Sequence, residues 1–201
     1  NVVPGDDITT ISRYFYDILA DFKPQESPLR PEAAAIMQNR PQNAETSSIR
    51  CLPLGVPRGE LMASPFKIVQ TPGLIVMMYE IDNTHRQIYT DGRKLPDDPN
   101  PAWLGYSVGH WEGETLVVDS AGFNDKFFID MVRHPISESL RVQERFRRRD
   151  FGHMDLEITI DDPKMYTKPI TFKVTQLLLP DGDIFEYFCP ENEKARAHMN
   201  R

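Results

Sequence analysis

One candidate for acid–base chemistry in this sequence is a glutamate placed among apolar residues. Glu144 lies two residues from both Val142 and Phe146, so a β-strand would put all three on one face. A carboxylate that points into a protein interior is costly unless it is paired. Glu144 therefore either belongs to a buried ion-pair network that fixes strand register or serves a ligand. The candidate partners are Arg86, Arg93 and Arg145.

Two further glutamates have the same kind of setting. Glu80 is in phase with Val76 and Met78, and Glu186 is in phase with Phe188. The pattern predicts that both carboxylates share an apolar face. A register slip of one residue would turn each of them outward.

Histidines are the other candidates for proton transfer near neutral pH. His110 precedes Trp111 on a predicted strand, and His134 lies in a loop before Pro135. Each is equally compatible with a structural, hydrogen-bonded role. No two histidines have the spacing of a helical metal site, and the two cysteines are far apart, so no metal site is predicted.

A catalytic interpretation assigns these residues to roles. Glu144 or His110 would act as acid–base, Asp119 or Asp91 would orient it, and Arg93 or Arg145 would hold an anionic group. The residues expected to contact a substrate also include Trp111, Tyr79, Phe127 and His134.

Several function classes are excluded by missing patterns. Gly105–Gly109 resembles a nucleophile elbow only in its glycine spacing, because a β-hairpin follows it. The chain has no phosphate-binding loop and no dinucleotide glycine motif, so no cofactor is predicted. The net charge of −7 argues against nucleic acid as a partner, and the run of arginines from 145 to 149 is interpreted as a solvated strand end. No apolar run is long enough for a membrane span.

The elements that must position these residues are mostly strands. Helices are predicted over residues 8–22, with Asp6 or Asp7 as cap, and over 31–39. From residue 66 the apolar period changes to two, and about nine strands follow at 66–70, 74–81, 86–90, 106–111, 115–119, 140–148, 154–160, 170–178 and 184–189. The fold class is therefore mainly β, an antiparallel up-and-down barrel or strongly curved sheet with short N-terminal helices. Residues 1–65 would form a helical and extended arm on a β domain of residues 66–201, one structural domain overall.

A long excursion interrupts the strands between Ser120 and Pro135. It carries Phe123, Phe127 and Phe128. Because loops over a barrel mouth commonly shape a ligand site, we expect this segment to cover the mouth of an interior cavity.

A set of motifs resembles a family of exported bacterial proteins, most of them uncharacterised, over residues 28 to 192. The motifs are Pro28-Leu29-Arg30-Pro31-Glu32, Cys51-Leu52-Pro53-Leu54-Gly55-Val56-Pro57-Arg58, Tyr89-Thr90-Asp91-Gly92-Arg93, Gly109-His110-Trp111-Glu112-Gly113-Glu114-Thr115-Leu116-Val117-Val118-Asp119 and Glu186-Tyr187-Phe188-Cys189-Pro190-Glu191-Asn192. The resemblance implies a lipocalin-like architecture, a Cys51–Cys189 disulfide, and a periplasmic or secreted protein. Many relatives have a histidine where this chain has Ile136.

Two functions remain open from the sequence. The first is a cofactor-independent lyase or isomerase that acts on a small hydrophobic or aromatic molecule in the barrel cavity. The second is a non-catalytic small-molecule binding or carrier protein, or a structural subunit of an exported assembly, and self-association fits either. A carrier should have an apolar interior, whereas an enzyme should bring an acid–base pair with shifted pKa values into its cavity.

Overall fold

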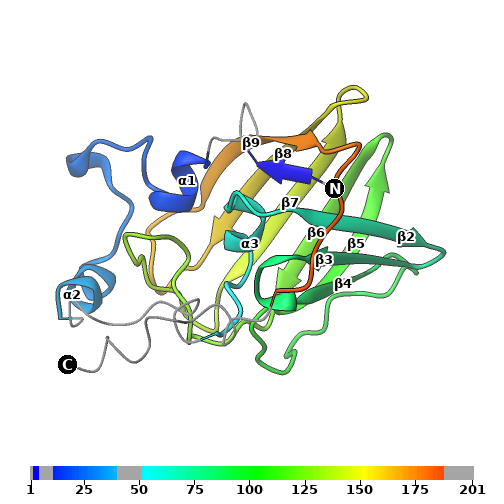
Figure 1. The fold of residues 1–201 in the computed structure, drawn as a ribbon. Helices are drawn as coiled ribbons and strands as arrows, with labels where there is room; N and C mark the ends of the chain where they lie inside the picture. Colours follow the sequence, from blue (N-terminus) through cyan, green and yellow to red (C-terminus); the bar gives the residue numbers. More distant parts are fainter. Residues whose placement is uncertain (1, 5–10, 40–50, 188–201) are drawn as a thin grey trace.

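A single curled sheet dominates the computed structural model, which describes residues 2–4, 11–39 and 51–187 (Figure 1). The strands follow one another in chain order around the sheet: β1 (Val2–Pro4), β2 (Phe66–Thr71), β3 (Leu74–Tyr79), β4 (His85–Tyr89), β5 (Tyr106–Glu112), β6 (Thr115–Ala121), β7 (Arg141–Arg148), β8 (His153–Asp161) and β9 (Ile170–Leu178). From β2 to β9 the sheet curls into a half-barrel, and the short β1 pairs with both β9 and β2. The predicted fold class is confirmed.

One junction departs from the predicted up-and-down pattern. The strands β4 and β5 run parallel and pair only at Ile88–Ser107 and Tyr89–Val108, whereas every other neighbouring pair is antiparallel. Parallel neighbours need a crossover connection, here residues 90–105, because the chain must return to the end where β4 began. As a result, β4 and β5 pair over a short length, and the remaining parts of their facing edges are not paired with each other.

The inward face of the barrel forms the core. Successive residues along a strand point to opposite faces of the sheet, so residues two apart share a face, as on β7, where Val142, Glu144 and Phe146 are all buried. Ile158 on β8 and Phe172 on β9 are also buried and pair in register. This strand phase on β7 is the one that the sequence predicted.

The two ends of the barrel are built differently. The β2–β3 and β5–β6 turns, and residues 149–152, lie at one end. At the other end the excursion of residues 122–140 packs with the short helices α1 (Arg13–Tyr16) and α3 (Arg58–Leu61). Tyr14 of α1 stacks on the inward-facing Phe172 with ring centroids 4.2 Å apart. We refer to these as the open end and the closed end.

The predicted helix over residues 8–22 is wrong for its described part. Helix α1 covers a single turn that begins after its cap, Ser12, and the chain is extended at Asp17. The amide of Ile18 then donates to the carboxylate of Asp130 instead of to a helical carbonyl. The apolar spacing in this segment reflects burial at the closed end, where tertiary contacts override helical periodicity. The predicted caps, Asp6 and Asp7, lie outside the described residues.

Helix α2 (Pro31–Asn39) has the bounds that the sequence predicted. The short 3₁₀ segment η1 (Pro24–Glu26) precedes it. The main chain between η1 and α2 is hydrogen-bonded to the loop after β8. The amide of Thr167 donates to the carbonyl of Pro28, and the amide of Arg30 donates to the carbonyl of Met165. In the part of the chain that the structure describes, no helix has both the length and the hydropathy to cross a bilayer.

The predicted strand at 184–189 is also wrong for its described part. Residues 184–187 form no regular structure, and Phe185 is exposed. The edge of β9 that this strand would have occupied is taken by β1. The sequence predicted no strand among residues 1–65, so the pairing of β1 with β9 was not expected.

Candidate functional site

A buried polar cluster occupies the middle of the barrel. The guanidinium of Arg86 bonds Glu60 at 2.9 Å and also bonds Glu144, and the exposed fractions of these three side chains are 1%, 0% and 0%. Its remaining bonds go to the hydroxyls of Ser107 and Ser120, at 3.0 and 2.8 Å. One cation thus holds two carboxylates in a site without solvent contact.

Glu60 reaches this cluster because α3 enters the barrel from the closed end. The side-chain amide of Gln176 on β9 donates to the carbonyl of Glu60 at 2.9 Å. Gly59 lies against the ring of Tyr79, where an added Cβ would be 3.4 Å from a ring carbon. The hydroxyl of Tyr79 donates to Glu60 Oε1.

The electrostatics of the cluster follow from burial. Burial, and then the nearby charge of Glu144, raises the pKa of Glu60 from its ordinary 4.5 to about 7, against the lowering effect of Arg86. Burial alone would lower the pKa of Arg86, but the two carboxylates outweigh it and raise that pKa. Burial also raises the pKa of Tyr79 well above 10.

An apolar cup lies at the open end, above the cluster. It is a cavity of about 120 Å³ lined by Ile68, Gln70, Ile75, Met77, Ile88, Trp111, Glu114, Leu116, Phe146, Arg148 and Met154. Trp111 is 49% exposed and Ile68 is 37% exposed. Large apolar side chains that stay open to solvent around a concavity are typical of a binding site for an apolar molecule.

The cup and the cluster do not share a surface. Met77 and Phe146 line the cup, and on their own strands they stand two residues before Tyr79 and two after Glu144. Neither Glu60 nor Glu144 lines the cup. The two buried carboxylates are therefore separated from the apolar cavity.

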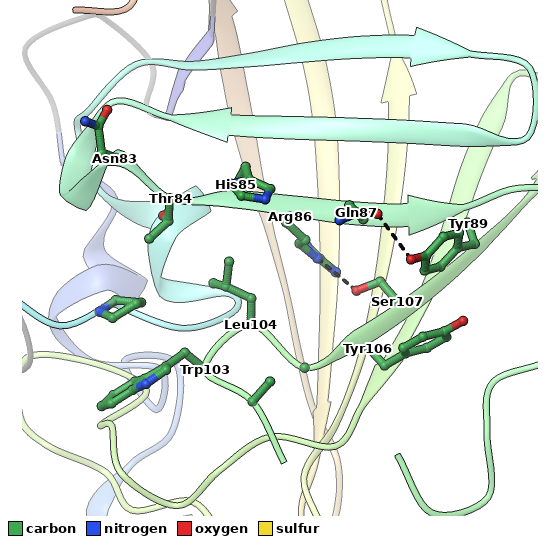
Figure 2. A pocket seen from close by; sticks show the side chains of 13 residues that line it. Asn83, Thr84, His85, Arg86, Gln87, Tyr89, Trp103, Leu104, Tyr106 and Ser107 are labelled. Carbon is green, nitrogen blue, oxygen red and sulfur yellow. Dashed lines mark hydrogen bonds between the residues drawn. The ribbon is translucent and has the colours of Figure 1, made fainter. Parts of the chain in front are cut away.

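A second, wider pocket of about 470 Å³ opens where β4 and β5 separate. Figure 2 shows Arg86 and Ser107 joined by a hydrogen bond, with the Leu104 side chain pointing toward β4 from the connection before β5. The lining residues are Pro53, Asn83, Thr84, His85, Arg86, Gln87, Tyr89, Ala102, Trp103, Leu104, Gly105, Tyr106 and Ser107. The lining of this side pocket thus includes Arg86 and Ser107 of the buried cluster.

Of the residues predicted from the sequence, Glu144 and Tyr79 meet in the cluster. The prediction that Glu144 points inward with a cationic partner, and that Arg86 is a candidate for it, is confirmed. Trp111 lines the cup instead.

His110 and Arg145 are not in the barrel interior. Both lie on its outer surface and pair there with Glu112, at 3.3 and 2.7 Å. The hydrogen bond from Arg145, followed by that from His110, lowers the pKa of Glu112. These are contacts of a solvated surface. His110 therefore lies outside the barrel, whereas Glu144 lies inside it.

Asp91, Arg93 and Asp119 are also outside the barrel. The Arg93 guanidinium bonds Asp91, lies 3.8 Å from the centre of the Tyr89 ring, and donates to the hydroxyl of Tyr106. The hydrogen bond from Arg93 lowers the pKa of Asp91. The Arg93 guanidinium thus contacts Tyr89 and Tyr106, which both line the side pocket. Asp119 accepts a bond from Gln143 at 2.9 Å.

Phe127 and His134 belong to the closed end. Phe127 is 2% exposed and lies against Gly55, which has a positive φ of 80° and no room for a side chain there. Asp130 accepts from both the main-chain N and Nδ1 of His134, at 3.0 and 2.5 Å. With Asp17 these two residues form a group of metal-ligand type, but the Asp130 carboxylate is already occupied by these bonds and by that from Ile18.

The excursion does not cover the cup. Phe123 and Phe127 are buried at the closed end, and neither the cup nor the side pocket is lined by them or by Phe128. The prediction failed because the excursion joins the end of β6 to the start of β7, and that end of the barrel is opposite the hairpin turns.

The predicted positions of Glu80 and Glu186 are wrong. On β3 the buried residues are Ile75, Met77 and Tyr79, so the inward phase is the one that excludes Glu80. Glu80 follows the strand and accepts from the amide of Phe185. Glu186 is exposed and lies on no strand. The sequence of β3 is apolar at every position, so alternation could not reveal its phase.

Sequence reasoning missed Glu60. The residue follows Arg58-Gly59 in a segment predicted to be an extended arm, where a glutamate is ordinarily solvated. The apolar Leu54, Val56 and Leu61 around it are all fully or nearly buried and were the available signal.

Among the described residues there is no free thiol. The predicted partner of Cys51, Cys189, lies outside the described residues, so their pairing stays a prediction.

No family model, no curated protein and no solved structure matches the chain.

Proposed function

We propose that this protein binds a small apolar or aromatic molecule in the cup at the open end of its barrel. The observation that carries the proposal is the cup itself, an apolar cavity with Trp111 at its rim and the charged cluster sealed away beneath it. This arrangement has the apolar ligand surface expected of a carrier. Export, the Cys51–Cys189 disulfide and membership of the exported bacterial family belong to the same proposal, on the strength of the motifs.

The size of the cup limits what enters it. An apolar cavity of about 150 Å³ accommodates benzene. A cup of about 120 Å³ therefore takes one ring or the end of an alkyl chain, and the rest of a larger ligand would extend past Trp111 and Ile68.

Fluorescence titration tests this function. The chain has two tryptophans, so a Trp103→Phe variant leaves Trp111 as the only tryptophan reporter. We expect the apolar dye N-phenyl-1-naphthylamine to quench Trp111 saturably and to be displaced by alkyl and aryl competitors. No saturable quenching by any of these compounds would contradict the proposal.

Neighbouring residues on β2 supply a matched pair of variants. Ile68 lines the cup and Val69 faces solvent, and they are 37% and 39% exposed. Ile68→Ser should weaken dye binding by roughly tenfold, because it removes apolar contact worth about 1–2 kcal/mol. Val69→Ser should leave binding unchanged, and equal effects of both variants would place the dye elsewhere.

A cofactor-independent lyase or isomerase is the second candidate. It is favoured by the side pocket, whose aromatic wall includes Tyr89, Trp103 and Tyr106 and whose lining includes Arg86 and Ser107 of the cluster. Such an enzyme would exchange substrate protons with solvent. The test is deuterium uptake from D₂O into small aromatic ketones and acids, expected to stop in Glu144→Gln and to persist in the surface variant Glu112→Gln. Absence of exchange in the unmodified protein would leave no support for catalysis on these substrates.

A further inference from the structure

The two carboxylates of the buried cluster have more negative charge than Arg86 can balance. If both were ionised, Glu60, Glu144 and Arg86 would sum to −1 at the centre of the barrel. The other groups that face them are neutral: Tyr79 from β3, Ser107 from β5, Ser120 from β6 and Gln176 from β9. An uncompensated buried charge is strongly unfavourable.

Each carboxylate also has one oxygen without a partner. Glu60 Oε2 and Glu144 Oε1 are buried and accept no hydrogen bond, although the other oxygen of each group is bonded to Arg86. Buried polar atoms are nearly always satisfied. A proton on either oxygen would remove the excess charge and convert an unsatisfied acceptor into a donor.

We propose that Glu60 and Glu144 share a single proton in the folded protein at mildly acidic to neutral pH. The cluster is then a neutral unit of one carboxylic acid, one carboxylate and one guanidinium. Because the two groups interact strongly, the proton belongs to the pair. The raised pKa of Glu60 has the direction that this arrangement requires.

The inference goes beyond ligand binding in the cup and does not depend on it. It places a proton donor and a proton acceptor on the same guanidinium, and that guanidinium lines the side pocket. If the second candidate function holds, this pair is its acid and base. If that function fails, the shared proton is still required to cancel the excess buried charge.

Infrared spectroscopy of the intact protein tests the proposal directly. At about pH 6, below the raised pKa and above that of free glutamate, we expect one carbonyl band of a buried carboxylic acid. The band should vanish in Glu60→Gln and in Glu144→Gln, because either change removes the need for the proton. It should persist in Glu112→Gln, which changes a surface carboxylate. Absence of the band from the unmodified protein would overturn the proposal and would mean that both groups are ionised and met by buried water.

One other acid needs a control. Both carboxylate oxygens of Asp82 are buried and accept no hydrogen bond, and burial raises the pKa of Asp82 to about 6 against the lowering effect of Arg58. Asp82 should therefore contribute a carbonyl band of its own at about pH 6, so the glutamine variants are compared in an Asp82→Asn background. In that background, a band that survives in both glutamine variants would overturn the assignment to the pair.

A double variant adds a second readout. Each single glutamine change keeps one carboxylate for Arg86, whereas Glu60→Gln/Glu144→Gln leaves the guanidinium without any. We expect the double variant to lower the urea midpoint of unfolding by much more than the sum of the single changes. Additive effects would contradict a shared proton between coupled groups.

Discussion

Glu144 and Arg145 are adjacent in the sequence and form the same kind of ion pair in opposite surroundings. Glu144 bonds Arg86 inside the barrel with no exposed surface, and Arg145 bonds Glu112 on the outside with 34% of its side chain exposed. In water an ion pair of this kind contributes little, because solvent screens it and both side chains lose freedom. In the interior, removal of Arg86 would leave the Glu144 carboxylate unpaired and desolvated.

The two pairs also differ in what surrounds them. The outer pair has His110 beside it and water in contact with Glu112, which is 50% exposed. The inner pair has a second carboxylate, Glu60, and hydroxyl groups in fixed positions. Residue type thus specifies which groups can pair, whereas burial sets how much the pairing contributes to stability.

The largest expected effect comes from removing the inner cation. Arg86→Leu should lower the free energy of unfolding by about 3–5 kcal/mol, because two buried carboxylates would lose their counterion. Urea unfolding followed by circular dichroism measures it. Arg145→Leu is the matched change on the outer pair, and similar losses in both variants would refute the contrast.

A smaller effect is expected in the pH dependence of the free energy of unfolding, to which Glu60 beside the inner pair should contribute. The pKa of Glu60 is raised in the fold to about 7 from 4.5, so between these values the folded state binds more protons than the unfolded state. The stability contributed by this proton is therefore fully present below pH 4.5 and is lost as the pH rises through about 7. The slope is at most about 1.4 kcal/mol per pH unit, for a total on the order of 3 kcal/mol.

The measurement is the free energy of unfolding of the unmodified protein minus that of Glu60→Gln, taken across this range. The difference should fall with rising pH and become flat above neutrality. A difference that stays constant from about pH 5 to about pH 8 would show that Glu60 does not titrate in this range.

The smallest expected effect concerns the outer pair. Arg145→Ala should change the free energy of unfolding by about 0.2–1 kcal/mol at low salt, and the change should shrink in about 1 M NaCl, where the Debye length is about 3 Å. Parallel urea titrations at the two salt concentrations measure it. A loss that is larger than this and independent of salt would show that Arg145 has a packing role.

Strand content was predictable wherever one face of a strand is polar. On β7 the alternation of Val142, Glu144 and Phe146 with arginine and glutamine gave the correct phase and the inward carboxylate. On β3 every side chain before Glu80 is apolar, so both phases fit the sequence, and the predicted phase is wrong. Alternation is informative only when solvent demands polar residues on the other face.

The predicted helix over residues 8–22 failed for a different reason, because its periodicity is clear but the deciding contacts are not local. Phe15, Ile18 and Leu19 have helical spacing and are all buried, yet only one helical turn forms. The segment reaches the closed end of the barrel and obtains its hydrogen bonds from Asp130 and the excursion. Those partners are more than a hundred residues away, so no local pattern could reveal them.

By itself the sequence determined the fold class, most strand positions, the bounds of α2 and the inward direction of Glu144, because these depend on local periodicity. Only the tertiary structure decided that Glu60 joins Glu144 on Arg86, that His110 and Arg145 stay outside, and that β4 and β5 separate to open the side pocket. These contacts join residues from distant strands and from α3. They depend on how the sheet closes and on the end of the barrel that α3 enters. Both are decided by the packing of the whole core, which no local sequence pattern describes.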